Sequence, residues 1–223
     1  MIRIHNPEKQ GAHLAGLEGT RHIIAVEGAD DAAVTEFLAR GTVDDALIYV
    51  AGGETKLSRV ISLLMDLRGS EDLESITIMR DANGDPEAKN ASSIAIFRSL
   101  GLHAPQSAFV LGPGRPKAGI LLMPPSGTGC LESVLLDAYP RMEDRDHARA
   151  FAKAIDQGDP TASQWTISQT AKREMRALLG VGSKRLDLKW NTIIPRASRQ
   201  GLWRPEHPAF RPYLEYFSSL AGL

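Results

Sequence analysis

Short apolar runs of strand length alternate along this chain with longer segments in which apolar residues recur every three or four positions. The first kind of segment predicts buried strands, and the second predicts helices. The predicted strands are residues 21–26, 46–50, 75–79, 107–111 and 119–123. The predicted helices are residues 30–38, 57–65, 88–100 and 131–139. Strands that alternate with helices of this length indicate a parallel sheet with right-handed crossovers, so the pattern predicts an α/β fold.

The same pattern divides the chain into three parts. Residues 1–20 are expected to be an extended or poorly ordered lead-in, and residues 21–140 an α/β domain with a mostly parallel, Rossmann-like sheet. Residues 141–223 contain no convincing strand. We expect this part to be a helical C-terminal extension that packs on the core. Its predicted helices are residues 148–155, 162–179 and 208–220.

The composition is that of an ordinary globular protein. Hydrophobic residues make up 43% of the 223 residues and charged residues 24%, which excludes collagen-like and wholly disordered chains. No apolar run approaches the roughly 18 residues of a membrane-spanning helix, and the first residues lack the apolar stretch of a secretory signal. Cys130 is the single cysteine, which excludes intramolecular disulfides and favours a buried structural thiol. These features favour a cytoplasmic protein with no membrane partner.

The formal net charge of −1 hides an uneven distribution. Residues 1–140 carry 12 basic and 18 acidic side chains, whereas residues 141–223 carry 14 basic and 9 acidic side chains. An acidic N-terminal part can hold cations, and a basic C-terminal part can hold phosphates. Random variation of surface charge explains the difference equally well, so both explanations stay open.

Oxygen-bearing side chains follow several predicted strands. Ligands of open α/β sheets bind outside the carboxyl ends of the strands, where these side chains would gather. Carboxylates that lie close together repel, and an all-oxygen set favours a hard cation such as Mg²⁺ or Mn²⁺. The oxygen donors at this edge are Glu27, Asp30, Asp31, Asp81, Asn83, Asp85 and Glu132.

Each of these residues also has an ordinary structural explanation. Asp31 can cap a helix, and Glu132 can lie in the first turn of its helix without a ligand. Asp81 to Asp85 can be a polar turn, because Asp, Asn and Gly are common turn residues. Any one of them is more often structural than functional. Their joint placement at strand ends is what favours a site.

Two of these segments resemble motifs of the Toprim domain, which occurs in topoisomerases, primases, ribosomal-RNA maturases and overcoming-lysogenization-defect nucleases. Residues 26–31 resemble its strand–glutamate–glycine motif, and residues 81–83 resemble its Asp-x-Asp motif. More narrowly, the chain resembles small stand-alone Toprim-like proteins. Gly52-Gly53 and residues 129–132 and 201–203 support this resemblance. The resemblance covers residues 21–140 and fits the predicted α/β fold.

This resemblance implies phosphoryl transfer on nucleic acid. Glu27 would act as general acid or base near the scissile phosphate. Asp81, with Asn83 or Asp85, would hold a Mg²⁺ or Mn²⁺ ion. The family's motif has a second aspartate where this chain has Asn83, which can offer a carbonyl oxygen but no charge. The departure puts metal affinity and catalysis in question.

In the nuclease branch of the family, an acidic residue four positions after the first glutamate helps to hold a second ion. The resemblance gives this role to Asp31, together with Glu132. Two ions about 4 Å apart stabilise the attacking and leaving oxygens of phosphoryl transfer. Lys56, Lys172 and Lys184 are the candidates for a basic residue that offsets the phosphate charge.

A loose basic series near the C-terminus is a candidate for nucleic-acid contact. Lys172, Lys184 and Arg185 would contact the backbone, although such residues are more often a solvated face. Topoisomerase activity would need a tyrosine nucleophile in a separate domain, so a Toprim-type magnesium-dependent nuclease is the favoured function. The alternatives are a non-catalytic binding module and a subunit that works with a separate ATPase. The oligomeric state, including a homodimer, stays open.

Overall fold

A five-stranded parallel sheet forms the centre of the computed structural model, which describes residues 3–5, 19–68, 72–158, 165–182 and 201–223. The strand order is β1-β3-β2-β4-β5, and every neighbouring pair is parallel. The predicted α/β fold with a mostly parallel sheet is therefore confirmed. The strands are β1 (Arg3–His5), β2 (His22–Val26), β3 (Ala46–Val50), β4 (Ser75–Asp81) and β5 (Lys117–Met123).

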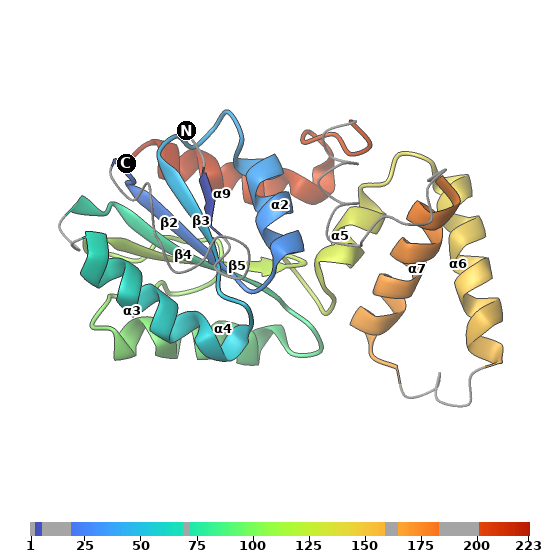
Figure 1. Cartoon of the computed structure of the whole chain (residues 1–223), viewed down its shortest axis with the longest axis horizontal. Coiled ribbons are helices and arrows are strands. Elements are labelled where there is room, and N and C mark those ends of the chain that lie inside the picture. The colour runs from blue at the N-terminus through green and yellow to red at the C-terminus, as the bar shows by residue number, and fades with distance from the viewer. Residues whose placement is uncertain (1–2, 6–18, 69–71, 159–164, 183–200) are drawn as a thin grey trace.

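Helices cover both faces of this sheet (Figure 1). Helices α3 (Leu57–Arg68) and α4 (Pro86–Ser99) lie on one face. Helices α2 (Ala29–Ala39), α5 (Leu131–Asp137) and α9 (Arg211–Ala221) pack on the other. Every residue of β2 and β3 is buried, which explains why residues 23–26 and 46–50 are continuous apolar runs without polar alternation.

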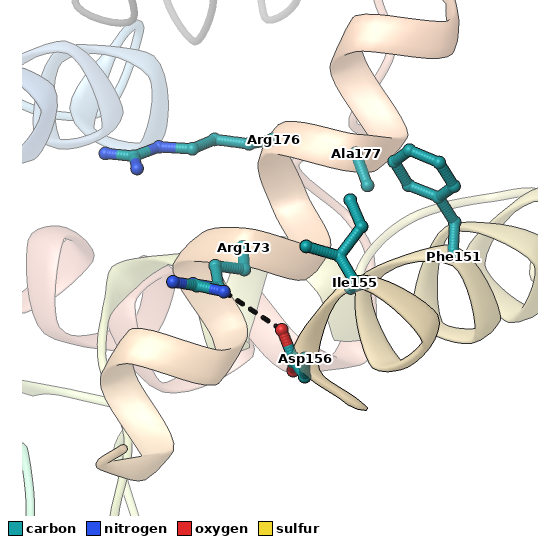
Figure 2. Close-up of a pocket in the computed structure, with 7 residues that line it drawn as sticks. Phe151, Ile155, Asp156, Arg173, Arg176 and Ala177 are labelled. Atoms are coloured by element: carbon teal, nitrogen blue, oxygen red, sulfur yellow. Dashed lines mark hydrogen bonds and ion pairs between the residues drawn. The ribbon is translucent and has the colours of Figure 1, made fainter. Parts of the chain in front are cut away.

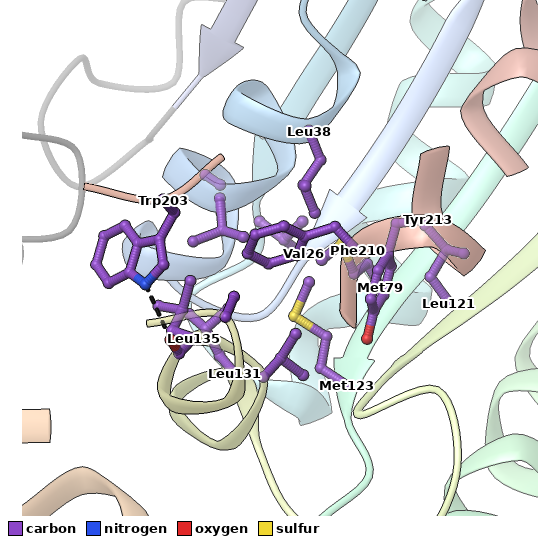
Figure 3. Close-up of a cluster of buried hydrophobic side chains, with 14 of the residues drawn as sticks. Val26, Leu38, Met79, Leu121, Met123, Leu131, Leu135, Trp203, Phe210 and Tyr213 are labelled. Atoms are coloured by element: carbon purple, nitrogen blue, oxygen red, sulfur yellow. Dashed lines mark hydrogen bonds between the residues drawn. The ribbon is translucent and has the colours of Figure 1, made fainter. Parts of the chain in front are cut away.

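Two apolar clusters result, one on each side of the sheet. Alternate residues of a strand belong to different clusters: Ile24 and Val26 face α2 and α9, whereas Ile23 and Ala25 face α3. Figure 3 shows the first cluster, in which Trp203 donates a hydrogen bond from Nε1 to the carbonyl oxygen of Leu135 at 2.9 Å. This bond satisfies the indole N–H, the one polar group of a side chain that is 1% exposed.

Helix α9 is fixed to the sheet through two tyrosine hydroxyls. The Tyr213 hydroxyl donates to the carbonyl oxygen of Leu122 at 2.9 Å. The Tyr216 hydroxyl lies 2.7 Å from Oγ1 of Thr77. Both contacts are buried, so they add direction to the apolar packing of this helix. The predicted helix at 208–220 corresponds to a 3₁₀ turn, η4 (Pro208–Phe210), followed by α9.

The predicted strand at 107–111 is wrong. Phe109 has φ +64°, a left-handed conformation that breaks an extended strand. Two backbone hydrogen bonds still hold the segment against β5, from Phe109 N to Ile120 O and from Gly112 N to Ala118 O, both at 2.8 Å. Apolar composition at 107–111 thus reflects packing on the sheet, and Phe109 contacts Tyr213 edge to face.

The N-terminal lead-in contributes one strand that the sequence pattern did not show. Arg3, Ile4 and His5 pair in parallel with Leu47, Ile48 and Tyr49 and extend the sheet beyond β3. Three residues are too few for a periodic pattern, so pairing with β3 is what defines this strand. Residues 6–18 lie outside the described part of the chain.

Two long helices stand beside α5 at one end of the molecule (Figure 1). They are α6 (Met142–Gln157) and α7 (Ile167–Gly182). Glu174 of α7, which is buried, pairs with Arg145 and Arg149 of α6, and Arg145 also pairs with Asp137 of α5. These ion pairs hold α7 to α6 and α6 to α5. None of the described helices combines the length and apolar character that a membrane crossing needs.

A shallow cavity of about 300 Å³ lies between α6 and α7 (Figure 2). Phe151 and Ile155 form its apolar wall, and Arg173 donates to Asp156 at 3.0 Å on its polar side. Arg173 also stacks on the ring of Trp165, 3.1 Å from the ring centre. None of the residues that line this cavity carries any of the predicted site chemistry.

The close approach of α9 to β5 requires glycine at position 119. A Cβ atom at Gly119 would lie 1.7 Å from the Tyr216 hydroxyl oxygen. Gly119→Ala is therefore expected to lower the free energy of unfolding by about 1–3 kcal/mol, the usual cost of overpacking. Chemical denaturation would measure this loss.

The matched control is Gly180→Ala, because position 180 in α7 has open space around it. This change should leave stability unchanged or raise it by up to about 1 kcal/mol. In a Tyr216→Phe background, the cost of Gly119→Ala should shrink, since the clashing oxygen is gone. An equal cost in both backgrounds would contradict the proposed clash.

Candidate metal centre

Three carboxylates meet at the carboxyl ends of the central strands. Asp81 is the last residue of β4, Asp31 lies in the first turn of α2, and Glu132 lies in the first turn of α5. We call these three residues the carboxylate cluster. Strand β2 leads into α2, and β5 leads through residues 124–130 into α5. Because β2, β4 and β5 are parallel neighbours or next neighbours, their following segments reach the same edge.

Backbone hydrogen bonds set the direction of two of these side chains. Asp81 Oδ1 accepts from the N–H of Leu131 at 2.8 Å, which ties the end of β4 to the start of α5. Asp31 Oδ2 accepts from the N–H of Gly28 at 2.8 Å. Each aspartate therefore keeps one oxygen that these bonds do not use. The loop before α5 is fixed by a bridge between Asn83 and Gly129, with N···O distances of 2.6 and 2.7 Å.

The cluster is electrostatically crowded. Burial, followed by the charge of Asp81, raises the pKa of Asp31 well above its usual value, against the hydrogen bond from Gly28. Burial raises the pKa of Asp81 from 3.8 to about 6, and Glu132 and Glu27 act in the same direction. These shifts record the cost of placing several negative charges in one buried place.

Glu132 is the most deeply buried member. It is 3% exposed, and its Oε2 atom has no hydrogen-bond partner within the described structure. A fully buried carboxylate oxygen without a partner is costly, which points to a ligand at this place. Cys130 lies beside it, and one ligand atom from each of Asp81, Cys130 and Glu132 lies within 4.8 Å of the others.

Helix α7 supplies the cation that faces the cluster. The charges of Glu132 and Asp81 raise the pKa of Lys172, although burial, the largest single effect, lowers it. Ser168, one turn earlier on α7, donates from Oγ to Oδ1 of Asn83 at 2.9 Å. Of the two basic candidates within the described residues, Lys56 and Lys172, it is Lys172 that the structure brings to the carboxylates.

Glu27 lies at the rim of the cluster and is held by an arginine. Arg80 Nε donates to Glu27 Oε1 at 2.9 Å, and the same guanidinium pairs with Glu54. Arg80 also donates to the hydroxyls of Ser92 and Ser93 on α4. Sequence reasoning missed this residue, although an arginine inside a buried strand, next to Asp81, was a visible signal.

The remaining predicted site residues either have other contacts or fall outside the described part of the chain. Asn83 has φ +53° and its side-chain oxygen is bonded to Ser168. Asp85 is exposed and caps α4 by accepting from the N–H of Ala88 at 2.8 Å, which is its ordinary structural role. Lys56 is exposed in the 3₁₀ turn η1 (Glu54–Lys56). Lys184 and Arg185 lie outside the described residues.

The donor set fits a divalent cation. Asp31, Asp81 and Glu132 offer oxygen atoms that the described hydrogen bonds leave unused, and one of these atoms is buried without a partner. A cation of charge +2 at this place would offset the repulsion that raises the pKa values of the two aspartates. Carboxylate oxygens suit Mg²⁺ and Mn²⁺.

The fold and this site define an α/β protein with an acidic, buried centre at the carboxyl edge of a parallel sheet. The chain belongs to the family described as "Protein of unknown function (DUF3226)", whose model matches residues 21–222. Among solved structures, the chain is similar to one titled "C-terminal region of the Xanthomonas campestris pv. campestris OLD protein phased with iodine". The two are 13% identical with a TM-score of 0.46, over 91% of this chain and 96% of that one. No curated protein matches the chain.

We predict that the metal-free protein becomes less stable as the pH rises from about 4 to above 6. The raised pKa of Asp81, about 6 in the folded state, means that the folded protein binds more protons than the unfolded chain over this interval. Asp31 acts in the same direction. Asp81→Asn keeps an oxygen for the Leu131 N–H and should raise stability near neutral pH by on the order of 1–3 kcal/mol. Urea denaturation in the presence of a chelator measures this.

Asp66→Asn is the control, because Asp66 is exposed on α3, away from the cluster. It should leave both the stability and its pH dependence unchanged. The electrostatic account fails if Asp81→Asn shows the same decline with pH as the unmodified protein.

Proposed function

We propose that this protein is a Toprim-type nuclease that depends on Mg²⁺ or Mn²⁺, or a related phosphoryl-transfer enzyme that acts on nucleic acid. The observation that carries this proposal is the convergence of the carboxylate cluster, with a buried unpartnered oxygen on Glu132, at the sheet edge where α/β proteins bind ligands. The sequence motifs around Glu27 and Asp81 resemble those of the Toprim family. This resemblance also implies metal-dependent phosphoryl transfer at the carboxyl edge of the sheet.

The residues divide by role in this proposal. Asp81, Glu132 and Asp31 hold the cation, which supplies charge stabilisation to a phosphate when it is bound. Glu27 contacts the reacting groups from the rim, held in place by its ion pair with Arg80. Lys172 is placed to neutralise a phosphate oxygen from the side of α7, since it faces the same carboxylates.

A non-catalytic binding module is the second candidate. Asn83 stands where the Toprim motif has its second aspartate, and its oxygen is bonded to Ser168. Asn83 therefore offers no negative charge to a cation, and its side-chain oxygen already accepts a hydrogen bond from α7. Such a module would bind a nucleotide or nucleic acid, or act as a subunit beside a separate ATPase, with the metal site kept for binding alone.

Titration of Mn²⁺ and Mg²⁺ by calorimetry tests the site directly. Asp81→Asn is expected to weaken binding at least about tenfold, which corresponds to about 1.4 kcal/mol, because it removes a charged ligand. Asp85→Asn is the matched control, since asparagine is also a good helix cap and Asp85 lies outside the cluster. Equal affinities for the two variants would argue against the cluster as the metal site.

Cleavage assays on single- and double-stranded DNA and RNA distinguish the nuclease from the non-catalytic binding module. Glu27→Gln should reduce metal-dependent cleavage by about 100-fold or more while metal binding is kept, as expected for a group that transfers a proton. Glu87→Gln, an exposed change in the first turn of α4, should have no effect. Metal and nucleic-acid binding without any cleavage would favour the binding module.

Lys172→Met should have opposite effects on the two ligands. Removal of the ammonium is expected to tighten Mn²⁺ binding several-fold, up to about tenfold, because a positive charge beside the cluster repels the cation. Binding of an oligonucleotide should become weaker, because the phosphate loses its basic partner. Lys153→Met on the exposed side of α6 is the control and should change neither. Weaker binding of both ligands would contradict this role for Lys172.

A further inference from the structure

Cys130 lies beside the carboxylate cluster, although a lone buried cysteine ordinarily acts as a small apolar residue. It is fully buried, at the residue before α5, and apolar residues of the first cluster pack on one side of it. On its other side, its Sγ atom lies within 4.8 Å of carboxylate oxygens of both Asp81 and Glu132. A thiol that only filled apolar space would not need two carboxylates as neighbours.

Outside the carboxylate cluster, the thiol has two long polar contacts. Sγ lies 3.8 Å from Oγ of Ser133 and 3.8 Å from the carbonyl oxygen of Ser168. Its charged neighbours include the carboxylates of Asp81 and Glu132, whose oxygen atoms lie within 4.8 Å. The independent sign of a ligand is Glu132 Oε2, which is buried without a partner in a side chain that is 3% exposed.

We propose that Asp81, Cys130 and Glu132 form a mixed oxygen and sulfur site that binds a thiophilic divalent cation, such as Zn²⁺ or Cd²⁺, more tightly than Mg²⁺. This inference rests on the proposed metal site and names the class of metal that it prefers. Soft thiolate ligands select such cations, whereas an all-carboxylate site suits Mg²⁺. Three protein ligands leave coordination positions free for a further ligand, which is the arrangement of catalytic rather than structural zinc sites.

Binding of the cation to Cys130 releases the proton of the thiol. Metals bind cysteine as the thiolate, so the cation forms a bond to Sγ while the thiol proton leaves to solvent. The cation brings a charge of +2 and the thiolate a charge of −1, so a net charge of +1 is added beside Glu132 and Asp81. Lys172 opposes any cation at this place, and it opposes thiophilic and hard cations alike. The thiol is therefore what distinguishes the two classes of metal.

Cd²⁺ and Mg²⁺, each added alone to the whole protein, test the inference. Cd²⁺ should bind with the ultraviolet charge-transfer band of a cadmium–thiolate bond. Cys130→Ser keeps the size and the helix-capping ability of the residue. It should abolish the band and weaken Cd²⁺ binding at least about tenfold, while Mg²⁺ affinity changes by less than about threefold. Calorimetry in two buffers should detect about one more proton released by the unmodified protein than by Cys130→Ser.

The outcomes separate this inference from the proposed function. Cd²⁺ binding without the band, no Cd²⁺ binding, or equal Cd²⁺ affinity in the two proteins would overturn the inference. If Mg²⁺ binding that depends on Asp81 remains in such a case, the proposed function stands. A band that depends on Cys130 without any Mg²⁺ binding would support the inference and count against a magnesium-dependent enzyme. Circular dichroism of Cys130→Ser checks that the variant is folded.

Discussion

Electrostatic repulsion within the carboxylate cluster is the main constraint on this structure. The fold holds Asp31, Asp81 and Glu132 together at a buried edge of the sheet, where their negative charges repel one another. The parallel register makes this crowding unavoidable, because segments that follow neighbouring strands reach one edge. The structure offsets the repulsion only in part. Arg80 binds Glu27 and Glu54, at the rim, so the inner carboxylates face Lys172 as their nearby cation. This imbalance is what makes the edge suited to a further positive charge.

Much of the fold follows from local sequence. Strands β2 to β5 are apolar runs that tertiary packing reinforces, and α2, α3 and α4 have apolar residues at helical spacing. Two segments did not follow these rules. Strand β1 exists only through its pairing with β3, which no local pattern reports. Residues 107–111 have the composition of a strand, but the conformation of Phe109 turns the chain while its ring packs on Tyr213.

The candidate site could be predicted as far as one rule applies. Acidic residues that directly follow parallel strands lie close together at the carboxyl edge of the sheet. That rule places Asp31, Asp81 and Glu132 together without knowledge of side-chain geometry. It could not show that Asp85 is used as a helix cap, because capping and ligation need the same residue type. It also could not choose among three lysines. Among the described residues, Lys172 is brought there by α7. Ion pairs hold α7 to α6 and α6 to α5, and a local sequence pattern does not report such contacts between helices.

The attachment of α9 has a consequence for how the chain folds as it is made. Its tyrosines bind residues 139 and 91 positions earlier, on strands β4 and β5. Until this helix leaves the ribosome, one apolar face of the finished strands has no complete cover. Contacts of such long range form slowly, and exposed strands in the meantime are prone to aggregate. During synthesis, the strands are therefore available before the helix that covers one of their faces.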